Sequence, residues 1–383
     1  MYILTTHLFS KNRIKQVIIG ISLFLLAFYP VYKNIYFGRA VEQVQRHLDF
    51  LNRESRFYNP WQYRVLTPWM VEATYYIYNH TIDRVFSIEE KVAFNLPEST
   101  TPKELVDQLF NSFKQKGNLK YFLIFVFYRF LFNIIIFLLL YKFLKAFIVN
   151  KYLLYLAILL ASLLLGNSVN DSDFTLHTYL DVILYLLTGC LILFKWNDKW
   201  IIPISIVGAF NRETSIMIPY LYFLSKVDWS AFHLNLKSIW SSRPDTRVIV
   251  ITAISYVLFM AIFVGIRLYY GYVEQTVWKV PAGWQMLKLN LFSIVSVKTY
   301  FEMLGTISLL PLIFLWYFKK MPFMLRLWFV AIVPIWFFVH WYSVVAYQSR
   351  LFLVPTFLIL LPAILFLIED KYRNMNLNQI SKP

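Results

Sequence analysis

The chain has 383 residues, of which 59% are hydrophobic, 20% are aromatic and only 15% are charged. A soluble domain carries about 25% charged residues, so this composition excludes an ordinary soluble protein and predicts an all-α, polytopic integral membrane protein. The formal net charge of +16 does not indicate nucleic acid, because Lys and Arg mostly flank apolar segments, as in proteins oriented by charge and bound to anionic lipid. The single Cys190 lies in an apolar segment and excludes a disulfide framework and a Cys-based metal site.

The first apolar segment, residues 15–32, has no cleavage site with small residues, so we expect an uncleaved anchor. Lys11, Arg13 and Lys15 precede it, which predicts a cytoplasmic N-terminus by the positive-inside rule. Residues 33–119 then form one long polar segment on the outer side. The protein is therefore expected in the plasma (inner) membrane of a cell envelope.

Helical patterns run through this external segment. Apolar and charged residues recur at helical spacing over residues 38–55, which predicts an amphipathic helix. Its predicted membrane-facing side carries Val41, Val44, Leu48 and Leu51. Thr67 followed by Pro68 is typical of a helix start, and that helix should end near Asn79. The residues from Thr101 to Glu104 form a capping box for a further helix. We therefore expect a folded layer of juxtamembrane helices.

Eight spans are predicted from apolar segments near the length that the bilayer requires, with an interfacial helix near 285–297 before the sixth. The spans are residues 15–32, 121–141, 152–169, 175–194, 248–269, 303–318, 327–345 and 351–368. The corresponding division of the chain is 1–32 (cytoplasmic N-terminus and first span), 33–119 (external helical loop), 120–200 (spans two to four), 201–225 (re-entrant hairpin), 226–368 (cytoplasmic loop and last four spans) and 369–383 (cytoplasmic tail).

The hairpin is predicted at residues 201–225, which are apolar at both ends and carry Asn211-Arg212-Glu213-Thr214 in the middle. A single crossing would place the basic loop 226–247 and the basic C-terminal tail outside, whereas a re-entrant hairpin places both inside. Charge bias therefore favours two short helices that enter and leave on the cytoplasmic side. Such breaks are tolerated where they line protein or a water-filled cavity.

Four groups of polar residues are expected on the outer face. They are Asp49 with Glu54, the Asp171-x-Asp173 motif, Arg212 with Glu213, and Arg350 at the mouth of the last span. Ionisable residues within membrane segments indicate function by default, which is why these groups are candidates for one site.

The layout resembles the GT-C superfamily of membrane glycosyltransferases over roughly residues 15–225 and the Arg350 region. Members have a cytoplasmic N-terminus, a long first external loop of juxtamembrane helices with an acidic residue, and often a DxD-like motif after the third span. The phrases Tyr63-Arg64-Val65-Leu66-Thr67-Pro68-Trp69 and Asn211-Arg212-Glu213-Thr214 also look like those of bacterial multi-pass proteins of this type. One departure is that no acidic pair directly follows the first span.

The resemblance implies inverting transfer of a sugar from a polyprenyl-phosphate carrier to a glycan, lipid or protein acceptor outside. A carboxylate must then accept the proton of the acceptor hydroxyl, and we assign Asp49 with Glu54 as the substitute. Cations must stabilise the leaving phosphate, which suits Arg212 and Arg350. Asp171 and Asp173 are assigned to sugar hydroxyls or to Mg²⁺ or Mn²⁺, the one cofactor expected. Arg64 and Glu213 complete the predicted substrate-binding residues, Glu213 by orienting Arg212 or by binding the sugar.

Structural alternatives exist for each group, and Asp171-x-Asp173 could be a short loop motif that occurs by chance. Asp49 has Arg46 and Arg53 one turn away and could form only surface pairs, Arg212 and Glu213 could be a structural ion pair, and Arg350 could be an interfacial anchor. The pairs Arg129/Asn133 and His177/Asp181 are interpreted as polar contacts within the bundle. Functional alternatives are a transporter or flippase of a lipid-linked or anionic substrate, and a polysaccharide polymerase or ligase.

Overall fold

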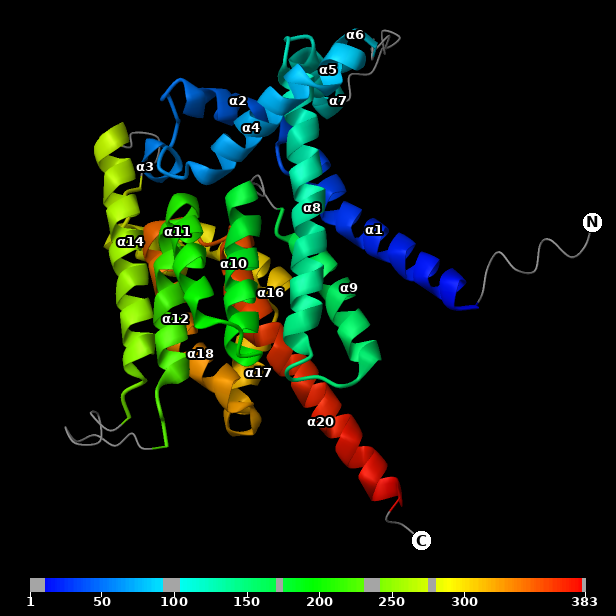
Figure 1. Cartoon of the computed structure of the whole chain (residues 1–383), viewed down its shortest axis with the longest axis vertical. Helices are drawn as coiled ribbons and strands as arrows, with labels where there is room; N and C mark the ends of the chain where they lie inside the picture. Colours follow the sequence, from blue (N-terminus) through cyan, green and yellow to red (C-terminus); the bar gives the residue numbers. More distant parts are fainter. Residues whose placement is uncertain (1–10, 92–103, 170–174, 231–241, 275–279, 381–383) are drawn as a thin grey trace, which may run out of the picture.

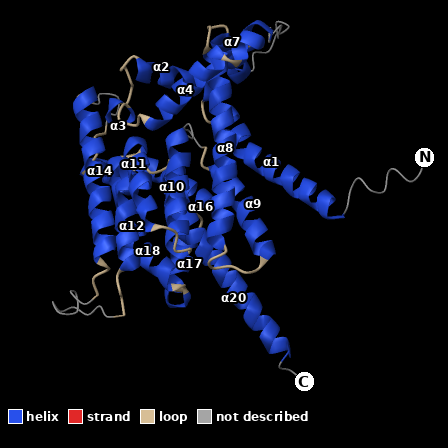
Figure 2. Ribbon diagram, viewed as in Figure 1, coloured by secondary structure: helices blue, strands red, loops and turns tan. Residues whose placement is uncertain are grey.

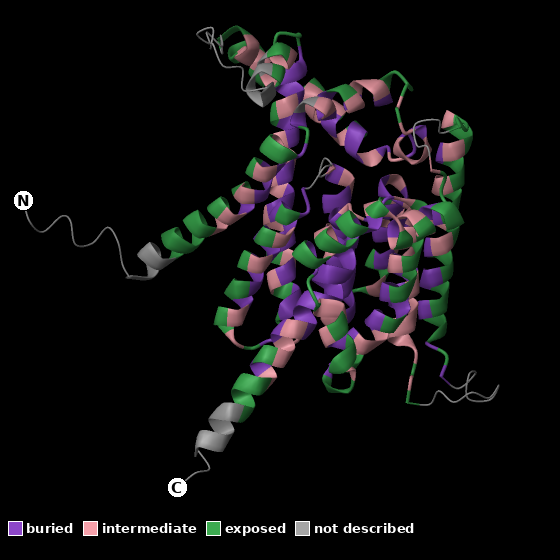
Figure 3. Cartoon of the chain, turned by 180° about the vertical axis from the view of Figure 1, so that it is seen from behind, coloured by how far each residue is buried: buried purple, intermediate pink, exposed green. Residues whose placement is uncertain are grey.

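The computed structural model describes residues 11–91, 104–169, 175–230, 242–274 and 280–380. Every regular element in these ranges is a helix (Figure 2). Long helices form a bundle, and a layer of shorter helices covers one of its ends, at the top of Figure 1. Burial is greatest in the middle of the bundle, while α1 and much of the C-terminal α20 lie at its edge (Figure 3). The predicted all-α class is confirmed.

Six helical segments in the described ranges have the length and composition of membrane spans. They are Gln16–Phe37, Asn118–Leu144, Leu176–Leu193, Thr246–Tyr270, Phe323–Ser343 and Ser349–Asn374. These belong to α1 (Lys11–Phe37), α8 (Asn118–Leu144), α10 (Leu176–Leu193), α14 (Thr246–Tyr270), α18 (Phe323–Ser343) and the segment that ends in α20 (Leu361–Ile380). The chain thus has the helices of a multi-pass membrane protein. The membrane in which it resides and the side of each terminus stay predictions.

Two of the eight predicted spans differ from the helices of the described residues. The third predicted span is α9, Lys151–Asn167, an apolar helix of only 17 residues. The predicted span 303–318 is broken, because α16 (Ile294–Thr306) and α17 (Leu310–Trp316) meet at a bend of 68°. Counting this bent pair as one span raises the number to seven.

Local residues explain the bend between α16 and α17, and also an earlier break between two helices. Ser308 has a left-handed backbone (φ 56°) between the two helices, and Pro311 stands in the first turn of α17, where its missing N–H costs nothing. The helix predicted near 285–297 also divides, into α15 (Trp284–Phe292) and the start of α16. Ser293 caps α16, since its Oγ accepts a hydrogen bond from the Val295 N–H at 3.1 Å.

The first helix, α1, is joined to the bundle at its proline. Pro30 removes the N–H that would bond to the Leu26 carbonyl. Ser162 Oγ of α9 donates to that carbonyl at 2.7 Å, and Asn133 Nδ2 of α8 donates to the Ala27 carbonyl at 2.8 Å. Polar side chains of two neighbouring helices thus satisfy backbone groups that lipid could not.

The layer of shorter helices is called the external layer because the sequence predicts it on the outer side of the membrane. It consists of α2 (Ala40–Leu51), α3 (Tyr58–Trp61), α4 (Leu66–His80), α5 (Ile82–Val85), α6 (Ile88–Lys91) and α7 (Glu104–Phe113). The predicted apolar side of α2 is confirmed in part. Val44 is buried and Leu48 packs against the core, but Gln43, His47 and Phe50 are buried as well, whereas Leu51 is 41% exposed. The reason is that α2 packs against α8 and bonds to α4, so polar side chains find protein partners on its buried side.

Thr67 is not the predicted cap of α4. The helix starts at Leu66 with Val65 as its N-cap, and Thr67 lies within the first turn. The Thr67 hydroxyl instead lies 2.8 Å from Nδ1 of His177 on α10. Thr101 of the predicted capping box lies outside the described residues.

Residues 201–226 form two antiparallel helices, α11 (Ile201–Asn211) and α12 (Met217–Lys226), joined by a short 3₁₀ turn that begins at Glu213. At the open end, Lys226 Nζ lies 3.1 Å from Asp198 Oδ1, just before α11. Near the turn, the backbone of Gly208 lies against the Ser215 side chain. The chain therefore leaves this helical hairpin at the end where it enters; that the hairpin is re-entrant in a membrane stays a prediction.

The hairpin lies along α14 at both of its ends. Arg247 on α14 donates to Asn197 at the open end, and Arg267 on α14 donates to Glu213 at the turn. A helix rises 1.5 Å per residue, so the backbones of these two arginines are about 30 Å apart along α14. The legs of 11 and 10 residues rise only about 15–17 Å, so the long arginine side chains cover part of that separation.

Cysteine labelling tests this arrangement. We expect Lys199→Cys and Asp245→Cys, at exposed positions that flank the hairpin, to react with an impermeant thiol reagent from the same side of the membrane. Arg56→Cys in the external layer should react from the opposite side. Buried Cys190 is replaced by serine in each variant, and permeabilised cells give the control for total labelling. Labelling of positions 199 and 245 from opposite sides would mean that 201–226 crosses once.

Candidate functional site: a basic pocket beneath the external helices

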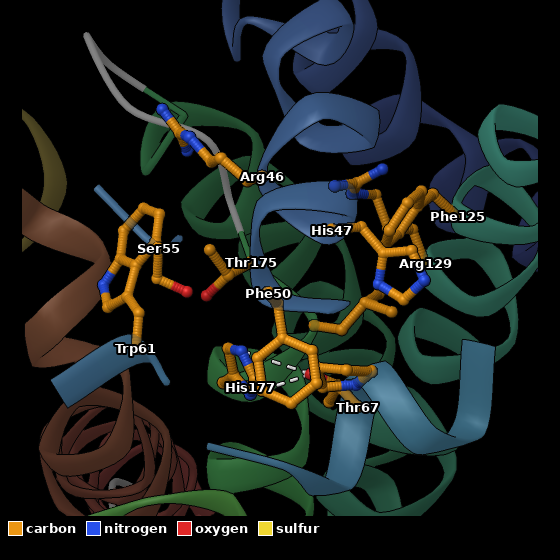
Figure 4. Close-up of a pocket in the computed structure, with 12 residues that line it drawn as sticks. Arg46, His47, Phe50, Ser55, Trp61, Thr67, Phe125, Arg129, Thr175 and His177 are labelled. Atoms are coloured by element: carbon orange, nitrogen blue, oxygen red, sulfur yellow. Dashed lines mark hydrogen bonds between the residues drawn. The ribbon is translucent and has the colours of Figure 1, made fainter. Parts of the chain in front are cut away.

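A pocket lies where the external layer meets the bundle (Figure 4). Its walls come from α2, α3 and α4 on one side and from α8 and α10 on the other. Twelve residues line it: Arg46, His47, Phe50, Ser55, Trp61, Thr67, Pro68, Phe125, Arg129, Thr175, Leu176 and His177. This lining combines aromatic rings, hydroxyl groups and basic side chains.

The ionised side chains among the described lining residues are basic. Arg46 and Arg129 contribute guanidinium groups, and no carboxylate of the described ranges belongs to the lining. Arg46 pairs with Glu42 at 2.7 Å and lies 4.9 Å from the centre of the Trp61 ring. Arg129 is 2% exposed and lies over the Phe125 ring at 5.7 Å. A half-enclosed pocket with two arginines is suited to an anionic group, and above all to a phosphate.

One histidine of the pocket is held by a carboxylate. His47 Nε2 lies 2.7 Å from Glu72 Oε1, and the Tyr121 hydroxyl donates to the same oxygen at 2.9 Å. The His47 side chain is 3% exposed and packs against the rings of Tyr121 and Phe125. The hydrogen bond from His47 lowers the pKa of the Glu72 carboxyl below its ordinary 4.5; partial burial opposes this, and the bond from Tyr121 adds to it.

This shift predicts an acid-sensitive contact between α2 and α4. A carboxyl whose folded-state pKa is depressed stabilises the fold above its unfolded pKa, and that contribution is lost as the pH falls through the folded value. We expect the wild type to unfold at a higher temperature than Glu72→Gln near pH 6, and the difference to shrink below pH 4.5. Thermal unfolding of detergent-solubilised protein between pH 3 and 7 measures it, and a difference that does not vary with pH would contradict it.

Arg212, at the turn of the hairpin, is bound to a buried carboxylate of α10. Its Nη1 lies 3.3 Å from Asp181 Oδ2, and Asp181 is completely buried. The hydroxyl groups of Thr214 and Ser215 also donate to Asp181, at 3.0 and 3.3 Å. Asn211 Nδ2 donates to the His177 carbonyl at 3.0 Å. The predicted polar site within the bundle is therefore a hydrogen-bonded joint between the hairpin and α10.

Glu213 joins three parts of the molecule. Arg64 of the external layer lies 3.0 Å from Glu213 Oε2, and Arg267 of α14 lies 3.2 Å from Oε1. In both ion pairs the partner of Glu213 is a residue other than Arg212. These contacts therefore differ from the predicted structural pair of Arg212 with Glu213 and from the predicted role of Glu213 in orienting Arg212. Tyr63, beside Arg64, donates to the Gly271 carbonyl at the end of α14 at 2.8 Å.

Arg350 is buried, 8% exposed, in the 3₁₀ turn Ser349–Phe352, where it donates to Gln348 at 3.1 Å. The charges of Arg64, Arg212 and Arg350 all act on His177. The structure therefore gathers three of the predicted binding arginines around His177, which lines the pocket. None of the three is among the lining residues.

The predicted acidic residues have other positions. Asp49 follows Arg46 by one turn of α2 and accepts a hydrogen bond from Gln45 at 2.7 Å, and Glu54 is exposed in the turn after α2. Neither lines the pocket. Asp171 and Asp173 lie outside the described residues. Within the described ranges no group of three or more His, Cys, Asp or Glu could hold a metal ion, so the predicted Mg²⁺ or Mn²⁺ stays a prediction.

Sequence reasoning missed Arg46 and His47 as site residues and assigned Arg129 and His177 to the bundle. The signal for His47 was its position three residues after Val44 on the inward side of α2, where an apolar residue was expected. The interpretation of Asp181 as a polar contact within the bundle agrees with its bond to Arg212.

Comparisons of the chain with protein-family models, with curated proteins and with solved structures found no match. The candidate site therefore has to be interpreted from its own chemistry.

Proposed function

We propose that this protein is a membrane glycosyltransferase of the GT-C type, which moves a sugar from a polyprenyl-phosphate carrier to an acceptor with inversion at the anomeric carbon. The observation that carries the proposal is the basic pocket between the external helices and the apolar bundle. A polyprenyl phosphate has the same two parts, an anionic head and a long apolar tail, and its head must be bound at such a boundary.

Each part of the lining has a role in the proposed reaction. Arg46 and Arg129 would bind the phosphate oxygens and stabilise the negative charge that develops on the leaving group. Trp61 and Phe50 offer rings for the apolar face of a sugar, and the hydroxyl groups of Ser55 and Thr67 offer hydrogen bonds. The pair of Arg212 with Asp181 would hold the hairpin against α10, and the pair of Glu213 with Arg64 would hold it against the external layer.

Transfer is tested with purified protein in lipid nanodiscs and a panel of radiolabelled C55 polyprenyl-phosphate hexoses. We expect release of polyprenyl phosphate coupled to a glycosylated product of inverted configuration, with candidate acceptors supplied as a cell-envelope extract. Arg46→Gln and Arg129→Gln should each lower kcat/KM about 10- to 100-fold, since a charge-assisted hydrogen bond is worth about 1.5–3 kcal/mol. Lys199→Gln, at an exposed position far from the pocket, is the matched control. No release of polyprenyl phosphate from any donor would refute the proposal.

Transport is the second candidate, and the break of the hairpin at Arg212 favours it. Transporters use broken helices of this kind to bind anionic substrates. A flippase would move a fluorescent polyprenyl-phosphate sugar across the bilayer of proteoliposomes without cleaving it. The same assay with product analysis separates the two functions, because only an enzyme breaks the bond between sugar and phosphate.

A further inference from the structure

We propose that His47, oriented by Glu72, is the general base of the pocket and accepts the proton of the acceptor hydroxyl. This inference rests on the proposed glycosyl transfer, and it puts His47 in the role for which Asp49 was expected. It follows from the position of the ring in the pocket lining and from its contact with a carboxylate.

The contact with Glu72 decides which nitrogen of His47 carries a proton. An ionised carboxylate only accepts hydrogen bonds, so Nε2 at 2.7 Å must be the donor. In the neutral ring, Nδ1 is then an acceptor with a free lone pair. The described residues contribute no hydrogen bond to Nδ1. A histidine in a pocket lining that is oriented through one nitrogen by a carboxylate, and whose other nitrogen can accept a proton, is the arrangement of a general base.

Neighbouring groups support this role. Glu72 of α4 and Tyr121 of α8 face the ring from behind, while Arg46 of α2 and Arg129 of α8 share the pocket with it. His177 of α10 also faces the pocket, but its ring bonds to the Thr67 hydroxyl, and no described carboxylate is hydrogen-bonded to it. His47 is thus the histidine of the lining that has an acidic partner.

The proposed step balances without a further reactant. The acceptor oxygen forms its bond to the anomeric carbon while its proton passes to His47 Nδ1. The bond between the anomeric carbon and the phosphate oxygen breaks, and its electron pair leaves on the phosphate beside Arg46 and Arg129. The positive charge on the ring is stabilised by the Glu72 carboxylate.

The first test compares substitutions in the transfer assay. His47→Gln keeps a side-chain N–H for Glu72 but has no basic nitrogen, so we expect kcat to fall about 100-fold or more with KM little changed. Imidazole in the buffer should restore part of the activity of His47→Ala. His80→Gln, on the exposed side of α4, should behave as the wild type.

Glu72 is a positioning residue, and its test uses the pH–rate profile. We expect Glu72→Gln to move the acidic limb of the profile of kcat, and Glu72→Asp to restore most of the wild-type profile. Well above pH 4.5 the contribution of Glu72 to stability does not vary with pH, so in that range a substitution that only weakened the fold would lower the rate at every pH alike.

The second test does not depend on transfer. Diethyl pyrocarbonate acylates unprotonated imidazole nitrogens, and peptide mapping by mass spectrometry locates the products. We expect His47 to react at pH 7, to be protected by C55 polyprenyl phosphate, and to react more slowly in Glu72→Gln. No reaction of His47 under conditions that modify His80 would overturn the inference.

The outcomes separate the two proposals. If the wild type transfers sugar and His47→Gln does so at the same rate, glycosyl transfer stands and His47 is not the base. If the wild type cleaves no donor, the proposed function fails and the base assignment fails with it, even where His47 is modified and protected.

Discussion

Asp181→Asn should lower the free energy of unfolding by about 3–5 kcal/mol, the usual effect of removing one partner from a buried ion pair. Asp181 is completely buried and Arg212 is 6% exposed, so the substitution leaves a positive charge inside the bundle without its counter-charge. The hydroxyl groups of Thr214 and Ser215 also lose their ionised acceptor. Chemical unfolding of the purified protein in detergent micelles measures the change.

Two further variants show whether the charge is the cause. Asp181→Leu combined with Arg212→Met removes both charges and should recover much of the lost stability, because well-packed apolar residues often replace a buried pair at little cost. Thr214→Val removes one hydrogen bond and should cost about 1 kcal/mol. If Asp181→Asn were no more harmful than Thr214→Val, the pair would contribute little to the fold.

Gly208→Ala should destabilise the protein by about 1–3 kcal/mol through overpacking in the hairpin. A Cβ at this position would lie 2.6 Å from Cβ of Ser215, which is closer than side chains approach each other. Because Ser215 also bonds to Asp181, a shift of the turn would disturb that joint too. The same unfolding measurement applies.

Gly265→Ala is the matched control for this effect. Gly265 lies in α14, and a Cβ at this position would have no described atom within 4 Å, so alanine should stabilise the helix by up to about 1 kcal/mol. Equal effects of the two substitutions would mean that the hairpin legs are not in close contact at Gly208.

Long apolar segments were predictable from the sequence because their signal is local. The predicted spans 121–141 and 248–269 lie within α8 and α14, and the position of Arg212 and Glu213 between two apolar stretches coincides with the turn after α11. Here length and charge distribution carry the information, and neither depends on a distant partner.

Contacts between distant segments were not predictable in this way. The apolar residues of α2 indicated only part of its inward side, because His47 is buried there through its contact with Glu72, which is 25 positions away. Asp49 was selected as base because it is an acid in the predicted first external loop. The carboxylate that contacts a lining residue of the pocket is instead Glu72 of α4, which lies beside His47. A contact between residues far apart in the chain, such as His47 and Glu72, leaves no periodic pattern in a single sequence from which it could be predicted.

The helical hairpin has a consequence for how the protein is made. Its legs of 11 and 10 residues are each too short for the insertion machinery to retain alone, and the contacts that hold them come from α10 and α14. We therefore expect residues 201–226 to be held in place only after α14, which begins at Thr246, has been synthesised. A re-entrant hairpin, as the charge bias predicts, adds no net crossing of the membrane, so every later helix is expected to keep the orientation set before it.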